Sequence, residues 1–200
     1  MTLAFSLQHN RTRQTQRRYI PKTEDEVKLV REMASGVNVV SLKDEEATVE
    51  RVLQVMRDTD WVHLACHRRQ MTEDSMKSCL LLHDKILELS EIVKHVLPRA
   101  DFAFLSACQT AVGNELRIAD ESVHLAAGMF LEGYRSVIAT MWSIKDKDAP
   151  QIAEDVYQGI LKDGRPNRKK AAHALHDAVK GLRDSGTKFV DWVPFIHLGR

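Results

Sequence analysis

The sequence predicts an α/β fold with a mostly parallel central sheet flanked by helices. Short apolar runs of strand length alternate with segments of helical periodicity, which is the pattern of βαβ units. The run FAFL at residues 102–105 is continuously apolar, as expected of a strand that helices cover on both faces. With 200 residues, 44% of them hydrophobic and 28% charged, the chain is predicted to form one domain over residues 1–200 with a sizeable core.

The first part of the chain predicts a strand, a loop and a helix. Thr2–Leu7 is predicted as the first strand, and the polar, basic residues 8–22 lack periodicity and are predicted as an exposed loop. Thr23 followed by Glu26 has the spacing of a capping box, which indicates a helix to about Met33.

Two further strands frame the second predicted helix. Gly36 ends the first helix, because glycine is favoured just past a helix C-terminus, and Val37–Leu42 follows as a strand. Glu46–Arg57 carries apolar residues at helical spacing and leads into the strand Trp61–Ala65.

A hairpin and a short helix are predicted in the middle of the chain. Cys79–Leu82 and Ile86–Leu89 flank the polar tripeptide His83-Asp84-Lys85, which is typical of a hairpin turn. Ser90 begins a short helix that ends near Pro98.

The C-terminal half of the chain also alternates predicted strands with predicted helices. Phe102–Ser106 and Ser136–Met141 are predicted strands, separated by the helix Ser122–Glu132, which Gly133 ends. The remaining predicted elements are the helices Asp148–Leu161 and Asn167–Asp184 and an edge strand over Phe189–Leu198.

The charge balance excludes a general affinity for polyanions. The chain carries 29 Lys and Arg against 28 Asp and Glu, so no net field attracts nucleic acid or an anionic membrane. Two local basic groups lack interleaved aromatic residues and are interpreted as a solvated loop and a helix start. They are Arg11, Arg13, Arg17 and Arg18, and Arg165, Arg168, Lys169 and Lys170.

Cysteine usage and hydropathy indicate reduced thiols and a cytoplasmic or nuclear location, of which we favour the cytoplasm. Three Cys is an odd number, and no segment has the layout of a signal peptide. No apolar stretch reaches the roughly 18 residues that span a bilayer, so we expect no membrane partner. The His residues are scattered without ligand spacing, so we expect neither a metal site nor a cofactor.

His67 and Cys108 each lie just past an apolar run that is predicted as a buried strand. The runs are WVHLACH, residues 61–67, and DFAFLSACQT, residues 101–110. Since parallel sheets gather their chemistry at the carboxyl ends of strands, adjacent runs would bring imidazole and thiol together, as in a cysteine nucleophile with a histidine base. The Ala-Cys-Gln triplet, with His67 lying 41 residues before Cys108, is compatible with a caspase signature.

Several ordered motifs together resemble the CHAT domain, a caspase-like domain related to separases. These motifs are VHLACH, LLLHDKILELSEI, FLSACQTA, DESVHLAAGMFLEGYRSVIATMWSIKD and WVPFIHLG, and the similarity runs from about Ile20 to Gly199. The resemblance implies a caspase-like three-layer α/β sandwich with catalytic His67, nucleophile Cys108 and a protein or peptide substrate. Family members commonly follow helical repeats that receive an activating signal, which implies a helical-repeat regulatory partner.

One position departs from the family pattern. The family histidine is normally followed by glycine, and this chain has Arg68. The resemblance implies that the backbone N–H groups of Arg68 and Cys108 bind the oxyanion, and one such donor contributes roughly 3 to 4 kcal/mol. If the turn required a left-handed φ, arginine would cost about 1 to 3 kcal/mol there.

The predicted chemistry depends on the pKa of the Cys108 thiol. A free thiol, with a pKa of about 8.5, is only a few per cent thiolate at neutral pH, so Cys108 needs a nearby imidazolium or backbone N–H groups. We expect His67 to protonate the leaving amine and then to activate water.

The neighbouring Cys and His residues have simpler interpretations. Cys66 and Cys79 are interpreted as small buried apolar residues, and Cys66 should face the side of its strand opposite to His67. His63 is interpreted as a core histidine, with a role as partner of His67 as the alternative.

Acidic residues on predicted loops at the carboxyl edge indicate selection of a basic substrate residue. Asp120 follows the nucleophile strand, and Asp146 follows the strand Ser136–Met141. A carboxylate at this edge would bind Arg or Lys, as in separase-like relatives. The alternatives are solvated loop acids and helix caps, with Asp148 a natural cap. Trp142 either walls the cleft or simply packs.

These features predict a caspase-like cysteine endopeptidase that cleaves after a basic residue. The alternative is a catalytically silent CHAT domain that acts as a protein-interaction or signalling module. The intact His67, Cys108 and flanking motif favour the enzyme, whereas Arg68 favours the silent module.

Overall fold

The computed structural model describes most of the chain. The described residues are 2–7, 22–34, 36–66, 68–69, 75–106, 119–142, 144, 148–162 and 165–200. Of the predicted loop 8–22, residues 8–21 lie outside this set, and Lys22 is the first residue of helix α1 (Lys22–Met33).

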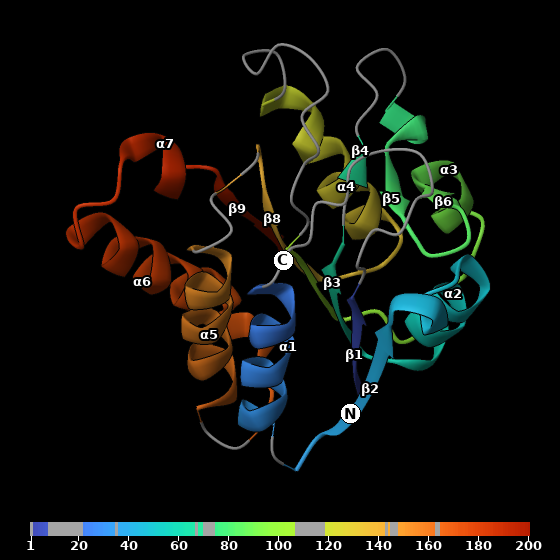
Figure 1. The fold of residues 1–200 in the computed structure, drawn as a ribbon, viewed down its shortest axis with the longest axis horizontal. Helices are drawn as coiled ribbons and strands as arrows, with labels where there is room; N and C mark the ends of the chain where they lie inside the picture. Colours follow the sequence, from blue (N-terminus) through green and yellow to red (C-terminus); the bar gives the residue numbers. More distant parts are fainter. Residues whose placement is uncertain are drawn as a thin grey trace.

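A six-stranded sheet forms the centre of the protein (Figure 1). Its strands, in spatial order, are β2 (Asn38–Lys43), β1 (Thr2–Leu7), β3 (Trp61–Ala65), β7 (Phe102–Leu105), β8 (Ser136–Thr140) and β9 (Phe195–Gly199). The first five are parallel to one another, and β9 is antiparallel to β8. The predicted mostly parallel α/β architecture is therefore confirmed.

Helices cover both faces of this sheet (Figure 1). One face carries α1, α5 (Asp148–Leu161) and α6 (Ala171–Asp184), and the other carries α2 (Val49–Asp58), α3 (Leu89–Ile92) and α4 (Ala119–Leu131). Within the described ranges, none of the helices is both long and apolar enough to cross a membrane.

Alternation along β3 divides the core into two layers. Val62 and Leu64 pack in the layer of α2, α3 and α4, whereas Trp61 and Ala65 pack in the layer of α1, α5 and α6. All residues of β3 and β7 are buried, because both strands lie in the interior of the sheet.

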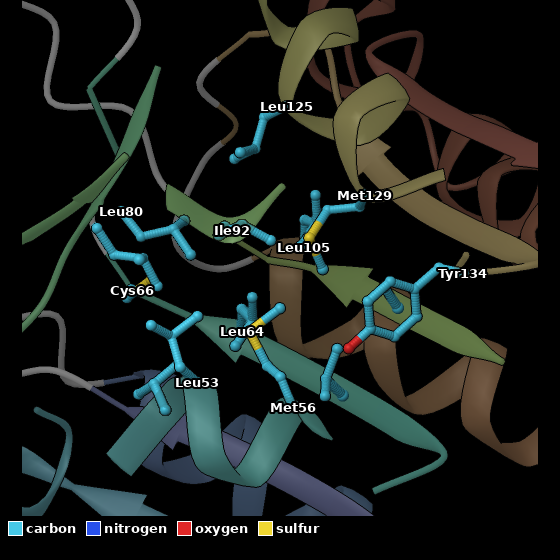
Figure 2. Packing of buried hydrophobic residues seen from close by; sticks show 14 of the residues in the cluster. Leu53, Met56, Leu64, Cys66, Leu80, Ile92, Leu105, Leu125, Met129 and Tyr134 are labelled. Carbon is cyan, nitrogen blue, oxygen red and sulfur yellow. The ribbon is translucent and has the colours of Figure 1, made fainter. Parts of the chain in front are cut away.

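Figure 2 shows the layer between the sheet and α2, α3 and α4, which includes Met56, Leu64, Leu105 and Met129. Tyr134 lies just after α4, and its side chain is buried in this layer with no hydrogen-bond partner for the hydroxyl among the described residues. Burial raises the pKa of Tyr134, because the phenolate would lose its hydration. The ring therefore contributes to the core as an apolar group.

A small antiparallel sheet contains the predicted hairpin. It consists of β4 (Arg68–Arg69), β5 (Cys79–Leu81) and β6 (Ile86–Glu88). At the hairpin tip, the Asp84 carboxylate accepts a hydrogen bond of 2.9 Å from the N–H of Val49, the first residue of α2. Because first-turn N–H groups have no partner within a helix, this bond satisfies one of them and fixes the hairpin to α2.

Two helix starts differ from the sequence prediction. α2 begins at Val49 and not at Glu46, because the Thr48 hydroxyl accepts a bond from the Arg51 N–H and caps the helix there. Asn167 caps a 3-10 turn, Arg168–Lys170, through a 3.1 Å bond from the Lys169 N–H to its side chain. α6 therefore begins only at residue 171.

The predicted strand Phe189–Leu198 is wrong over its first half. Phe189–Trp192 forms the short helix α7, and β9 begins at Phe195. Pro194 lacks an N–H, and its carbonyl accepts a 2.8 Å bond from the Met141 N–H directly before β9 begins. α4 also begins at Ala119, three residues before the predicted start.

Two helical glycines provide a matched test of the packing of α5 against α6. A Cβ at Gly159 of α5 would lie 2.6 Å from the Ala174 Cβ, whereas a Cβ at Gly181 of α6 would have no atom within 4 Å. We expect Gly159→Ala to lower the free energy of unfolding by about 1 to 3 kcal/mol through overpacking. Gly181→Ala should raise it by about 0.5 to 1 kcal/mol, because alanine favours the helix.

Urea denaturation of the two variants and the wild type measures both changes. Equal effects of the two substitutions would show that α5 and α6 do not approach closely at Gly159.

Candidate active site

The strands that precede His67 and Cys108 are neighbours in the sheet. β3 and β7 are parallel, and Trp61 pairs with Phe102 and Leu64 with Leu105. Each paired β3 residue thus faces the β7 residue 41 positions later, and Cys108 also follows His67 by 41 positions. The expected adjacency of the two strands is confirmed. His67 and Cys108 themselves lie outside the described residues, so their approach stays a prediction.

The other two cysteines are buried. Cys66 is 2% exposed and packs in the layer of α2, opposite to the face of Ala65. Cys79, in β5, is also 2% exposed. Both residues fit the interpretation as small buried apolar groups, and burial leaves neither thiol open to a reagent in the folded protein.

His63 is a core histidine. Its side chain is fully buried and stacks on Phe104, with ring centroids 4.9 Å apart and planes at 9°. Its Nδ1 lies 3.2 Å from the hydroxyl of Tyr157 in α5. These contacts fix the ring within the layer of α1, α5 and α6. His63 therefore has the position that its interpretation as a core histidine predicts.

Arg68 does not occupy a left-handed turn. It begins β4, the outer strand of the small sheet, and pairs with Leu80. Among the described residues, Asp44 alone of the non-glycine residues has a left-handed φ, at 46°. The cost that a left-handed φ would impose on arginine therefore does not arise at Arg68.

The hydrogen bonds of the small sheet indicate where the Arg68 N–H points. The carbonyl of Ser78 and the N–H of Leu82 bond to the β6 arm of the hairpin, at 2.8 and 2.9 Å. Bonded residues alternate along an antiparallel strand, so Leu80, midway between them, also directs its N–H and C=O toward β6. Arg68 faces Leu80 from the other side, in a pair without hydrogen bonds. Its N–H consequently points away from β5.

The structure describes only some of the acidic residues that are candidates for binding a basic substrate side chain. Asp120 is the second residue of α4, so it lies within the first helical turn and not on a loop. Its side chain, and all of Asp146, lie outside the described residues. Asp148 is the first residue of α5 and is 5% exposed, and a carboxylate there interacts favourably with the helix dipole.

Trp142 lies just past β8, at the carboxyl edge of the sheet. Its indole N–H donates a 2.9 Å hydrogen bond to the carbonyl of Val190 in α7. Phe189, the residue before Val190, is 67% exposed. Its ring centroid lies 5.0 Å from that of Trp192. Trp142 therefore packs against α7, and its part in a substrate cleft stays a prediction.

Sequence reasoning missed α7 as the partner of Trp142. The signal was present, because Phe189 and Trp192 have the i, i+3 spacing of one helical face and Pro194 follows shortly after. Aromatic residues are also common in strands, so this segment resembles an extension of β9.

The chain belongs to the CHAT domain family. The family model of the CHAT domain matches residues 2–200. This family lies in the caspase-like group of cysteine peptidases, so the resemblance in the sequence motifs is confirmed over nearly the whole chain. No curated protein sequence matches the chain.

Solved structures with a similar fold include cysteine proteinases. The crystal structure of the Arg specific cysteine proteinase gingipain R has a TM-score of 0.59 and 11% sequence identity, covering 98% of this chain and 46% of that one. The complex of Porphyromonas gingivalis RgpB pro- and mature domains has a TM-score of 0.57 and 10% identity, covering 99% and 46%. The chain thus spans less than half of the proteinase chains and shares their caspase-like fold.

Proline substitutions in β4 test the direction of the Arg68 N–H. Arg69 pairs with Cys79, the alternate position in the ladder, so its N–H should bond to β5. We expect Arg69→Pro to lower the free energy of unfolding by about 1 to 3 kcal/mol more than Arg68→Pro, because only Arg69 loses a ladder bond. Chemical denaturation checks the difference, and a larger loss from Arg68→Pro would reverse the assignment.

Proposed function

We propose that the protein is a caspase-like cysteine endopeptidase, with Cys108 as the nucleophile and His67 as its acid–base partner. The observation that carries the proposal is the register of β3 and β7, which pairs residues 41 positions apart. His67 and Cys108 have the same separation and follow these strands within three residues. Their position fits the carboxyl edge at which parallel α/β proteins gather catalytic groups. Membership of the CHAT family and the caspase-like fold support the same assignment.

In the proposed reaction, the Cys108 thiolate attacks the carbonyl carbon of the scissile peptide bond and forms a tetrahedral oxyanion. His67, as an imidazolium, protonates the amide nitrogen as the C–N bond breaks, and a thioester to Cys108 remains. Neutral His67 then takes a proton from water while the water oxygen attacks the thioester. Collapse of this second intermediate releases the carboxyl product and restores the thiolate–imidazolium pair.

Two backbone N–H groups bind the oxyanion in this proposal, those of Arg68 and Cys108. The direction of the Arg68 N–H supports its role, because a donor that points away from β5 is not consumed by the sheet. Each such donor contributes roughly 3 to 4 kcal/mol to transition-state stabilisation. Arginine retains the N–H that glycine provides in the family, so Arg68→Gly should change turnover by only a small factor.

Selection of Arg or Lys at the cleavage site is the second part of the proposal. Asp120 and Asp146 follow β7 and β8 in the chain, and a carboxylate at this edge would pair with a basic substrate side chain. Trp142 would supply the apolar wall against which the aliphatic part of that side chain packs.

A catalytically silent interaction module is the second candidate. The observation that favours it is Arg68, because the sequence has a long cationic residue at the position where the family has glycine. A helical-repeat protein is the regulatory partner that we propose in either case, on the basis of the family. A reducing compartment such as the cytoplasm would keep Cys108 as a thiol.

A peptide library tests the activity and its specificity together. We expect the wild type to cleave after Arg or Lys, and Cys108→Ala to abolish cleavage because the nucleophile is lost. Asp146→Asn and Asp120→Asn should each be assayed, and loss of the pairing carboxylate should lower kcat/KM for Arg substrates by about tenfold or more. Cys79→Ala, which removes a buried thiol, is the matched control and should leave activity unchanged.

Two outcomes would overturn parts of the proposal. A preference for Asp at the cleavage site would contradict the acidic pocket. No cleavage by the wild type or by Arg68→Gly, with candidate helical-repeat partners present, would favour the interaction module.

A further inference from the structure

A hollow of about 510 Å³ lies at the edge of the central sheet where β3, β7 and β8 begin. Asp60, Asp101 and Arg135, each just before one of these strands, line it. This edge is opposite to the carboxyl edge of the proposed peptidase site. Its volume is within the range of ligand-binding pockets.

Backbone hydrogen bonds hold this edge in place. The carbonyl of Asp60 accepts bonds from the N–H groups of Asp101 and Phe102, at 2.9 and 3.2 Å. The carbonyl of Asp101 accepts bonds from the N–H groups of Arg135 and Ser136, at 3.0 and 3.1 Å. The residues that line the hollow are therefore preorganised by the sheet, which reduces the entropy lost on binding.

Both carboxylates of the hollow are already paired. The Arg99 guanidinium contacts both carboxylate oxygens of Asp60, at 3.1 and 3.2 Å. Asp101 accepts a bond of 2.6 Å from Arg168 Nε and one of 3.1 Å from Trp61 Nε1. The two acidic groups are thus compensated by two arginines, and a bound anion would not face a free carboxylate there.

Arg135 is the remaining cation. It is exposed, and its guanidinium makes no ion pair or side-chain hydrogen bond with the residues that the structure describes. The hollow is lined by two arginines, Arg99 and Arg135, and by two aspartates, and Arg168 pairs with Asp101 from outside the lining. With Asp60 paired to Arg99 and Asp101 to Arg168, Arg135 is the guanidinium left to bind a carboxylate, its preferred partner.

Size and wall chemistry favour a peptide over a free ion. Pro98 and Pro166 also line the hollow and give its wall rigid apolar parts. An inorganic ion would fill a small part of this volume and would leave these walls without contact, whereas a peptide segment can bring an acidic side chain to Arg135 and apolar atoms to the prolines.

We propose that this hollow is a docking site for an acidic peptide segment of a partner protein, with Arg135 as the residue that binds its carboxylate. Because the hollow lies at the far edge of the sheet, such a partner could bind without covering the proposed peptidase cleft. The proposal does not depend on peptidase activity.

Fluorescence anisotropy with a fluorescein-labelled tetraglutamate peptide tests the site on the full chain. We expect saturable binding that weakens as salt is raised, and an affinity at least about tenfold lower for Arg135→Glu, because the charge that attracts the carboxylate is reversed. The matched control is Arg183→Glu, an equal charge reversal at an exposed residue near the end of α6, which should bind within about twofold of the wild type.

Competition with inorganic phosphate distinguishes a site for an acidic peptide from a site for a small inorganic anion. Phosphate should displace the peptide only at concentrations well above that of unlabelled tetraglutamate, and displacement by both at equal concentration would overturn the peptide assignment. Absence of wild-type binding, or equal weakening by Arg135→Glu and Arg183→Glu, would overturn the site. Thermal unfolding of each variant confirms that the fold is retained.

Discussion

The parallel pairing of β3 with β7 is the constraint on which the rest of the structure depends. These strands are buried on both faces, and each contributes alternate side chains to the two core layers. A shift of one residue would move every side chain of a strand to the other layer, which makes the register energetically specific. Hydrophobic packing therefore fixes the 41-residue register, and the register determines which residues of the two strands lie side by side.

The two edges of the sheet have different characters. At the amino edge, the carbonyls of Asp60 and Asp101 each accept two backbone hydrogen bonds, and Arg168 joins Asp101 to the carbonyl of Arg200 at the end of β9. Arg168 therefore connects the start of β7 to the residue after β9, and the interpretation of Arg168 as a solvated residue at a helix start is wrong. At the carboxyl edge, Trp142 bonds to α7, and the segments with the candidate catalytic residues follow the strands. In parallel α/β proteins, catalytic and binding residues are usually on loops at the carboxyl edge of the sheet, while the rest of the sheet is a rigid scaffold.

Much of the fold could be predicted from the sequence because burial leaves a strong pattern. Trp61–Ala65 and FAFL are apolar runs of strand length, so β3 and β7 were predicted closely. β4 consists of two residues in a polar segment. Only its pairing with β5 makes it a strand, so no local pattern in the sequence predicts it. The side-chain geometry of His67 and Cys108 does not follow from strand patterns at all, and their roles come from the family motifs. The selection of Arg by Asp120 or Asp146 depends on loop conformation, which composition does not determine.

The pH dependence of Cys108 alkylation tests the central claim most directly. Iodoacetamide reacts with the thiolate, so its rate in the folded protein reports the pKa of an accessible thiol, and Cys66 and Cys79 are each only 2% exposed. The account predicts that Cys108 in the wild type titrates well below the usual range of a free thiol, and that His67→Ala returns its pKa toward that range. An unshifted pKa for Cys108, identical in the wild type and in His67→Ala, would contradict the pairing of these two residues.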